Sequence, residues 1–234
     1  MYRSAGDCLK SYGFVEGCLQ NIEFIAPGIC SAWVYLHHAA SLLIILAREQ
    51  ERSQDRDEKI MMAKSYSAKG LEHLSCASGF SKTVADVQQN IYIHLASLYL
   101  ACSLNGEIDV TENVSQDDII IAKNCLMKVE MLILEGHPLT SLRQIQYYLA
   151  RSNLIFRQSK LSTDSELLPR QLETSLRYSE DALKLAEKCG FEEMVSYSRQ
   201  QVACVKRMRQ PGETLGEFDA DVYCTAKAVT RSSS

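Results

Sequence analysis

The chain has 234 residues, of which 46% are hydrophobic, so it is long enough to bury a substantial core. Its 25 basic and 29 acidic residues give a net charge of −4, so the chain lacks the strong overall positive charge expected of a protein that grips nucleic-acid phosphates, and only a local basic patch is left open. Only 4 prolines and 11 glycines are present, and this composition favours helices over strands.

The beginning of the chain, MYRSAGDCLKSYGF, is too polar for the apolar part of a secretory signal. The longest apolar run, 39–47, is less than half a membrane span. We therefore expect no membrane contact and a location in the cytoplasm or nucleus. The 9 cysteines are odd in number and contain no C-x-x-C pair, so they predict neither a disulfide framework nor a zinc site.

The first predicted element lies in FVEGCLQNIEFIAPG, residues 14–28, which ends at Pro27 and Gly28. It has the pattern of the second helix of an incomplete repeat. We predict that residues 1–28 form a partial N-terminal repeat or capping helix. This segment carries little charge, and the open end of a helical array exposes an apolar face. Self-association or a partner subunit is therefore expected to cover it.

A repeated helix, called helix A here, follows in three copies. The segments VYLHHA, IYIHLA and IQYYLA, at 34–39, 91–96 and 145–150, align without gaps. Their final alanines are separated by 57 and 54 residues. A fixed period of this size indicates stacked supersecondary units.

A second helix, called helix B, follows each copy of helix A. The three B patterns start at Ala63, Ala122 and Ser175. They end at glycines, which are typical of a left-handed helix cap, namely Gly79, Gly136 and Gly190. Polar loops are expected between A and B, over 49–59, 105–118 and 159–169, with Ser115 as an N-cap.

The fold class that follows is all-α, an α-solenoid of stacked antiparallel helix hairpins wound as a right-handed superhelix. Residues 29–210 are predicted to hold three helix pairs and a further A helix over 191–208, which Pro211 and Gly212 end. Residues 211–234 are predicted to form a short helix around 217–228 and a flexible tail.

These helix pairs resemble the tetratricopeptide (TPR) superfamily in a long-helix form. The resemblance is carried by small, aromatic, small and apolar residues of helix B, namely Ser175, Tyr178, Ala182 and Leu183, repeated by Ala63, Tyr66, Gly70 and Leu71. The period departs from the family's, which is about 34 residues, and the family's Trp-Leu-Gly signature is missing. The resemblance covers about 180 residues and implies a TPR-like superhelix with a binding groove.

No catalytic or metal-binding pattern accompanies these repeats. His37 and His38 are adjacent, so a helix directs them about 100° apart and they cannot hold one metal ion together. The chain contains no H-E-x-x-H, phosphate-binding glycine loop or G-x-S-x-G. We therefore predict a protein that is not an enzyme and has no metal or cofactor.

The predicted function is a non-catalytic scaffold or adaptor that binds a protein or peptide in the groove of the superhelix. The partner-binding residues are expected among the polar side chains of the A helices: His37, Arg48, Asn90, His94, Arg143, Gln146, Tyr147, Asn153 and Arg199. Arg143 is the predicted charged anchor, because arginine and tyrosine dominate interface energies. The alternative is a 14-3-3-like all-helical phosphopeptide-binding module, which needs a cluster of arginines and tyrosines.

Overall fold

The computed structural model describes residues 8–48, 54–77, 79, 81–102, 113–162 and 166–209, without the side chains of 8–12, 43–48, 54–56 and 81. In this part of the chain all regular structure is helical, which confirms the all-α prediction. The α-helices are α1 (Cys8–Gln20), α2 (Ile29–Arg48), α3 (Gln54–Ser75), α4 (Ser81–Tyr99), α5 (Gln116–Leu134), α6 (Ser141–Leu161), α7 (Leu167–Cys189) and α8 (Glu192–Arg209), with a 3-10 helix, η1 (Ile22–Phe24).

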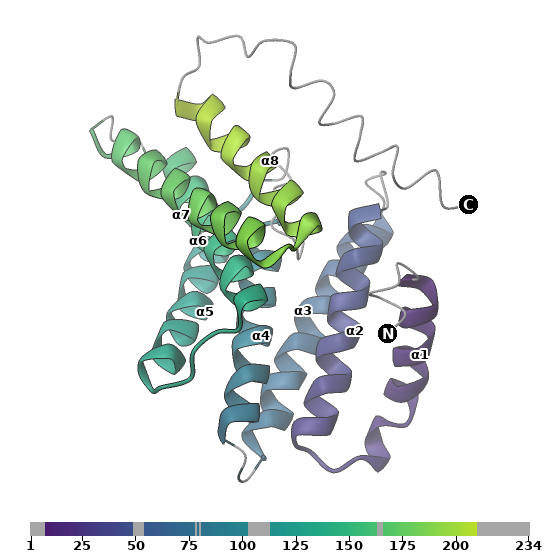
Figure 1. Ribbon diagram of the computed structural model, residues 1–234. Helices are drawn as coiled ribbons and strands as arrows, with labels where there is room; N and C mark the ends of the chain where they lie inside the picture. The colour runs from purple at the N-terminus through teal and green to yellow at the C-terminus, as the bar shows by residue number, and fades with distance from the viewer. Residues whose placement is uncertain are drawn as a thin grey trace.

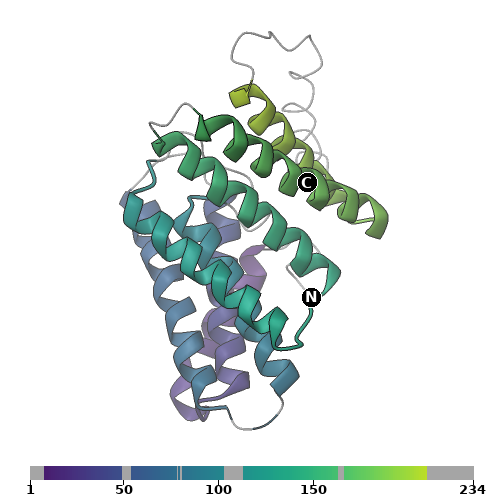
Figure 2. The same cartoon turned by 90° about the vertical axis from the view of Figure 1, so that its left-hand side faces the viewer.

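The helices pack in consecutive pairs. α2 lies against α3, α4 against α5, and α6 against α7, and these are the A and B helices that the repeat predicts (Figures 1 and 2). α1 packs on α2 at one end, and α8 packs on α7 at the other. The A helices also contact one another in series, α2 with α4, α4 with α6, and α6 with α8. Neighbours on several sides therefore enclose α4 and α6.

All three predicted loops extend too far into the adjacent helices, because α5 begins at Gln116, α6 ends at Leu161 and α7 begins at Leu167; the largest difference at a single boundary is in the first loop. α3 begins at Gln54, so the expectation of a loop up to residue 59 is wrong. The segment QDRDEK contains no glycine or proline to stop a helix, and acidic residues such as Asp57 and Glu58 are favourable near a helix N-terminus. The helix and tail predicted over 211–234 lie outside the described residues.

The three predicted glycine stops have left-handed backbone conformations, but only Gly136 and Gly190 lie at a helix end, since α3 ends at Ser75, before Gly79. Gly79, Gly136 and Gly190 have φ angles of +79°, +91° and +69°. At Gly136 the amide donates to the carbonyl of Ile133, and the next amide, that of His137, donates to Leu132. These two bonds satisfy carbonyls at the end of α5, and the left-handed residue between them is glycine because it has no Cβ to clash.

The core is continuous from α2 to α6. It is built from aliphatic residues of successive helices, including Leu36, Leu74, Ile91, Leu126 and Leu154, all at most 2% exposed. A second cluster joins α6, α7 and α8. The small helix-B residues are also buried, since Ala63, Ala122, Ser175 and Ala182 are each 0% exposed. Small side chains at these positions let helices approach closely.

Candidate protein-interaction sites

Five of the nine predicted binding residues are in the interior. Asn90, His94, Gln146, Tyr147 and Asn153 are buried, with exposed fractions from 0% to 9%. They are polar residues of α4 and α6, two A helices that have helical neighbours on both sides along the array. A partner at the surface of this structure does not reach them. Their part in binding remains a prediction that needs these two helices to move apart.

The other predicted residues are spread over three helices. The His37 ring is stacked on Trp33 in α2, with ring centroids 5.0 Å apart. Arg143 in α6 is half-buried and donates a hydrogen bond to Gln146 Oε1 at 2.7 Å. Arg199 in α8 is exposed and pairs with Glu187 at 3.0 Å. Arg48 ends α2, and its side chain lies outside the described part.

A hydrogen-bonded network surrounds Tyr147 at the junction of α5, α6 and α7. The Tyr147 hydroxyl donates to Glu130 Oε1 at 2.6 Å, and Arg151 Nη1 lies 3.3 Å from the same oxygen. The Arg151 guanidinium also lies over the ring of Tyr178, 5.7 Å from its centroid. Burial and the bond to Glu130 raise the pKa of Tyr147 well above its usual range, so the phenol stays protonated and continues to donate. The network ties these helices together.

His38 is a buried base on α2. Its ring meets that of Tyr66 edge-on, with centroids 4.5 Å apart, and only 1% of the residue is exposed. Burial lowers the pKa of His38 below 6.5, although the charge of Glu16 acts in the opposite direction. The neutral ring is therefore the form that the folded chain prefers.

We expect the stability of the fold to decrease as the pH falls below about 6.5. In that range the unfolded chain binds a proton at His38 that the folded chain does not bind, so protons favour unfolding until the pH passes the lower, folded-state pKa. Urea unfolding at pH 7.5 and pH 5.5 measures the effect. His38→Gln should show a smaller decrease over the same interval than the parent chain. Equal decreases in the two proteins would assign the pH dependence to other groups.

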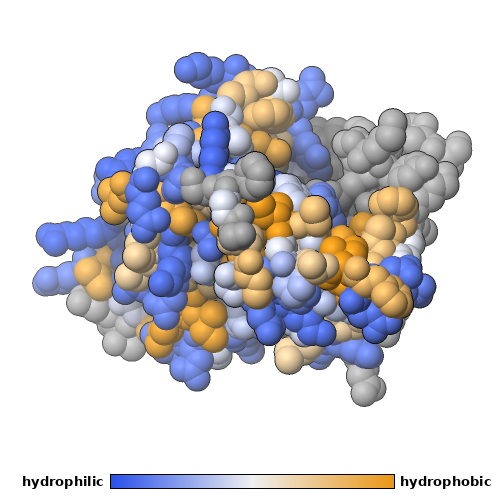
Figure 3. Space-filling model, turned by 90° about the horizontal axis from the view of Figure 1, so that it is seen from below, coloured by the Kyte–Doolittle hydropathy of each residue, from blue (hydrophilic) through white to orange (hydrophobic). Residues whose placement is uncertain are grey.

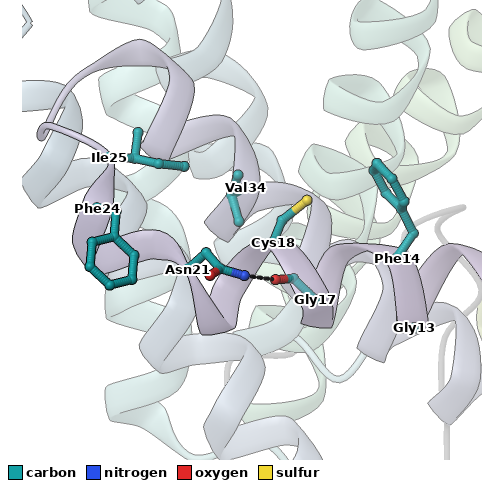
Figure 4. Close-up of a pocket in the computed structure, with 8 residues that line it drawn as sticks. All are labelled: Gly13, Phe14, Gly17, Cys18, Asn21, Phe24, Ile25 and Val34. Atoms are coloured by element: carbon teal, nitrogen blue, oxygen red, sulfur yellow. Dashed lines mark hydrogen bonds between the residues drawn. The ribbon is translucent and has the colours of Figure 1, made fainter.

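A shallow, open groove lies at the N-terminal end of the described helices. It has a volume of about 680 Å³ and is lined by apolar or small residues of α1, η1 and the start of α2, namely Gly13, Phe14, Gly17, Cys18, Asn21, Phe24, Ile25 and Val34 (Figure 4). We call it the terminal groove. The amide of Asn21 donates to the carbonyl of Gly17 at 2.9 Å, so the most polar lining group is already engaged.

The terminal groove exposes aromatic side chains to solvent. Phe14 is 67% exposed and Phe24 is 79% exposed. Gly13 and Gly17 lie one turn apart, and a Cβ built on either would meet nothing within 4 Å. The backbone of α1 is therefore open to close approach. Seen from below, apolar side chains reach the surface on the right-hand side of the molecule, where α1 and η1 lie, as well as at its centre and lower left (Figure 3).

Comparison with protein-family models, with curated proteins and with solved structures finds no match for this chain. Among the residues that the structure describes, no group of three or more histidine, cysteine or acidic side chains is arranged to hold a metal ion. None of the described helices has the length and apolarity needed to span a bilayer. A proposal of function therefore depends on the geometry of the surface.

Proposed function

We propose that this chain is a non-catalytic interaction scaffold of the TPR-like solenoid type, and that its terminal groove binds an amphipathic helix of a partner protein. The observation that carries the proposal is the groove itself, in which two highly exposed phenylalanines flank an open glycine surface on α1. Exposed aromatic residues beside a concave apolar surface are typical of a helix-in-groove interface.

The packing of the other pairs supports a helix as the occupant. α2 contacts its own B helix, α3, and the next A helix, α4, while α4 contacts α5 and α6 in the same way. α1 precedes α2 in the position of a B helix. A helix placed in the terminal groove would contact α1 as its pair partner and α2, through Val34, as the next A helix. It would thereby complete a pair.

The phosphopeptide-binding alternative has less support. The tyrosines of α6 and α7 do gather around an arginine, as that alternative requires. However, Arg151 is already paired with Glu130, whose carboxylate also accepts from Tyr147. A phosphate at this place would meet a negative charge and would have to displace it.

The test is an affinity purification with the full chain, followed by mass spectrometry and a binding measurement on the partner recovered. We expect the double variant Phe14→Glu, Phe24→Glu to bind that partner at least about thirtyfold more weakly, as expected when central apolar anchors are lost. Both side chains are exposed, so helicity should be unchanged. In hydrogen exchange, residues 13–25 should gain protection when the partner binds.

Arg143→Ala serves as the comparison variant, because Arg143 is the charged anchor predicted for the groove of the superhelix, which the A helices would line. The terminal-groove proposal expects this variant to bind the partner as the parent does. The reverse result, with binding lost in Arg143→Ala and retained in the phenylalanine variant, would refute the terminal groove and favour the A-helix surface.

A further inference from the structure

Helix α5 carries a second apolar surface, on the side that faces away from the core. Ile120, Met127, Met131 and Leu134 are 46%, 45%, 48% and 86% exposed. Their spacing of seven, four and three residues places them along one face of the helix. We call these four residues the α5 stripe. Because the core-facing side of α5 is also apolar, the helix is hydrophobic on two opposite sides, as is typical of a helix that is covered on both.

The fold itself does not require the α5 stripe. Aligning Ala122 with Ser175 pairs the stripe with residues of α7, the B helix of the next unit. The equivalent positions there are all charged, namely Glu173, Glu180, Lys184 and Glu187. The same architecture thus accepts charges at each of these four positions. The large apolar residues of α5 need a different explanation, and contact with another helix provides one.

The spacing of the stripe is that of a two-helix seam. When Asn124 is included, the positions 120, 124, 127, 131 and 134 follow one another at intervals of four and three. This is the a/d pattern of a coiled coil, and a single asparagine in such a seam fixes register and partner number. The exposure of the four stripe residues shows that none of the described helices covers the seam.

The charges along the edges of the seam favour a second copy of the chain, in one orientation. Lys123 and Glu130 lie on one edge, and Lys128 and Glu135 lie on the other. In a parallel pair, Lys123 would face Lys128 and Glu130 would face Glu135, so like charges would meet. In an antiparallel pair, the first edges face each other and Lys123 can face Glu130 of the second copy, twice by symmetry. Both contacts of Glu130 within the chain, to Tyr147 and Arg151, are made by Oε1, and its side chain is 38% exposed, so Lys123 would approach Oε2. The edges are therefore self-complementary only when the helices run in opposite directions.

One antiparallel register satisfies this pattern. With the two-fold axis between residues 125 and 126, Met131 packs on Ile120 of the second copy, and Met127 packs on its Asn124. Ile121, which is 39% exposed, then lies beside the aliphatic stem of Lys128 of the second copy. The next register along would place Glu130 against Glu130 and Lys128 against Lys128. The arrangement of charges therefore selects the first register.

We propose that the chain forms a homodimer through the antiparallel pairing of two α5 stripes. This surface is separate from the terminal groove, so the proposal does not depend on the proposed partner helix. The pair of Lys123 and Glu130 contacts sets the orientation, whereas the apolar residues supply most of the affinity, because exposed ion pairs contribute little.

The decisive variant is Met127→Glu with Met131→Lys, which introduces the residue types of Glu180 and Lys184 at the equivalent positions. Sedimentation equilibrium of the full chain, at concentrations up to about 100 µM, should show a dimer for the parent. The dimer dissociation constant of the variant should rise at least about thirtyfold. Both positions are exposed, so circular dichroism should be unchanged. Phe24→Glu, a matched change of an exposed apolar residue in the terminal groove, should leave the dimer intact.

A charge reversal tests the orientation and remains informative if the double variant fails to fold. Lys123→Glu places a carboxylate opposite Glu130 in the antiparallel pair and should weaken the dimer. In a parallel pair the same change would face Lys128 and strengthen it. A parent chain that stays monomeric overturns the proposal, as does a folded double variant that remains dimeric. A dimer that Phe24→Glu dissociates, while the α5 variants do not, would move self-association to the terminal groove.

Discussion

Ser175→Leu is expected to lower the free energy of unfolding by about 3 to 6 kcal/mol, through overpacking and lost hydrogen bonds. α6 and α7 are in close contact at this position. The Ser152 hydroxyl donates to the carbonyl of Ser175 at 2.9 Å, and the Ser175 hydroxyl donates to the carbonyl of Ser152 at 2.9 Å. The two hydroxyl oxygens are 3.0 Å apart, and both residues are fully buried.

A leucine at position 175 cannot occupy this space unless the helices separate. Separation would also disturb α8, because Gln201 donates to the Ser152 hydroxyl at 3.2 Å. Urea unfolding followed by circular dichroism measures the loss of stability. Glu173→Leu, which adds the same side chain at an exposed position of α7, should change the free energy by no more than about 0.5 kcal/mol. Ser175→Ala removes the hydroxyl without adding volume. Its loss of unfolding free energy should therefore lie between those of the two leucine variants, at about 1 kcal/mol. Similar values for the two leucine variants would contradict the close contact.

The sequence predicts the helices well because their boundaries depend on local chemistry. Gly136 and Gly190 end their helices through backbone bonds that span only a few residues. Ser115 caps α5 by accepting from the amide of Asp118 at 3.0 Å. The interval between Ala39, Ala96 and Ala150 indicates which helices are equivalent. None of these inferences requires knowledge of how distant helices are placed.

The exposure of the candidate binding residues was harder to predict, because it depends on which helices become neighbours. Asn90 and Asn153 are polar and were expected to face a groove, but α4 and α6 are enclosed by adjacent A helices. A polar side chain can satisfy its hydrogen bonds inside a protein, so polarity alone does not indicate exposure.

The α5 stripe escaped prediction for the opposite reason. Its apolar residues, such as Met127 and Met131, look like core positions when only the sequence is read. The structure assigns the core-facing side of α5 to Ala122, Cys125 and Val129, so the stripe is left outside. The sequence does hold a sign that these residues are not in the core. Met127 and Met131 are equivalent to Glu180 and Lys184 of α7, whereas equivalent core positions are expected to stay apolar in each unit.

Gly70→Leu is expected to destabilise the fold by about 3 to 5 kcal/mol, because it forces three helices apart. Gly70 is buried in α3, where a Cβ would lie 3.2 Å from Ile91 Cδ1 of α4. The same Cβ would be 3.5 Å from the carbonyl oxygen of Ala32 and from Cβ of Tyr35, both in α2. A leucine must place three further carbons beyond that point, against backbone that cannot rotate away.

Gly70→Ala separates this steric effect from helix propensity. Alanine in a helix is favoured over glycine by about 1 kcal/mol. The steric cost that opposes this gain is small, because only the end of the Ile91 side chain has to move by a few tenths of an ångström. The free energy of unfolding of the alanine variant should therefore be close to that of the parent. Ala68→Leu, two residues away on the exposed side of α3, provides the control for adding a leucine to this helix.

Thermal unfolding distinguishes the three variants, because 1 kcal/mol shifts the Tm of a domain of this size by roughly 2 to 4 °C. We expect Gly70→Leu to unfold about 10 °C or more below the parent, and the other two to stay within a few degrees of it. Gly70 occupies the second small position of the helix-B pattern, the place that Ala182 takes in the third unit. If leucine is tolerated there, the small residues do not mark close contacts between helices, and the main support for a TPR-like arrangement of the pairs is lost.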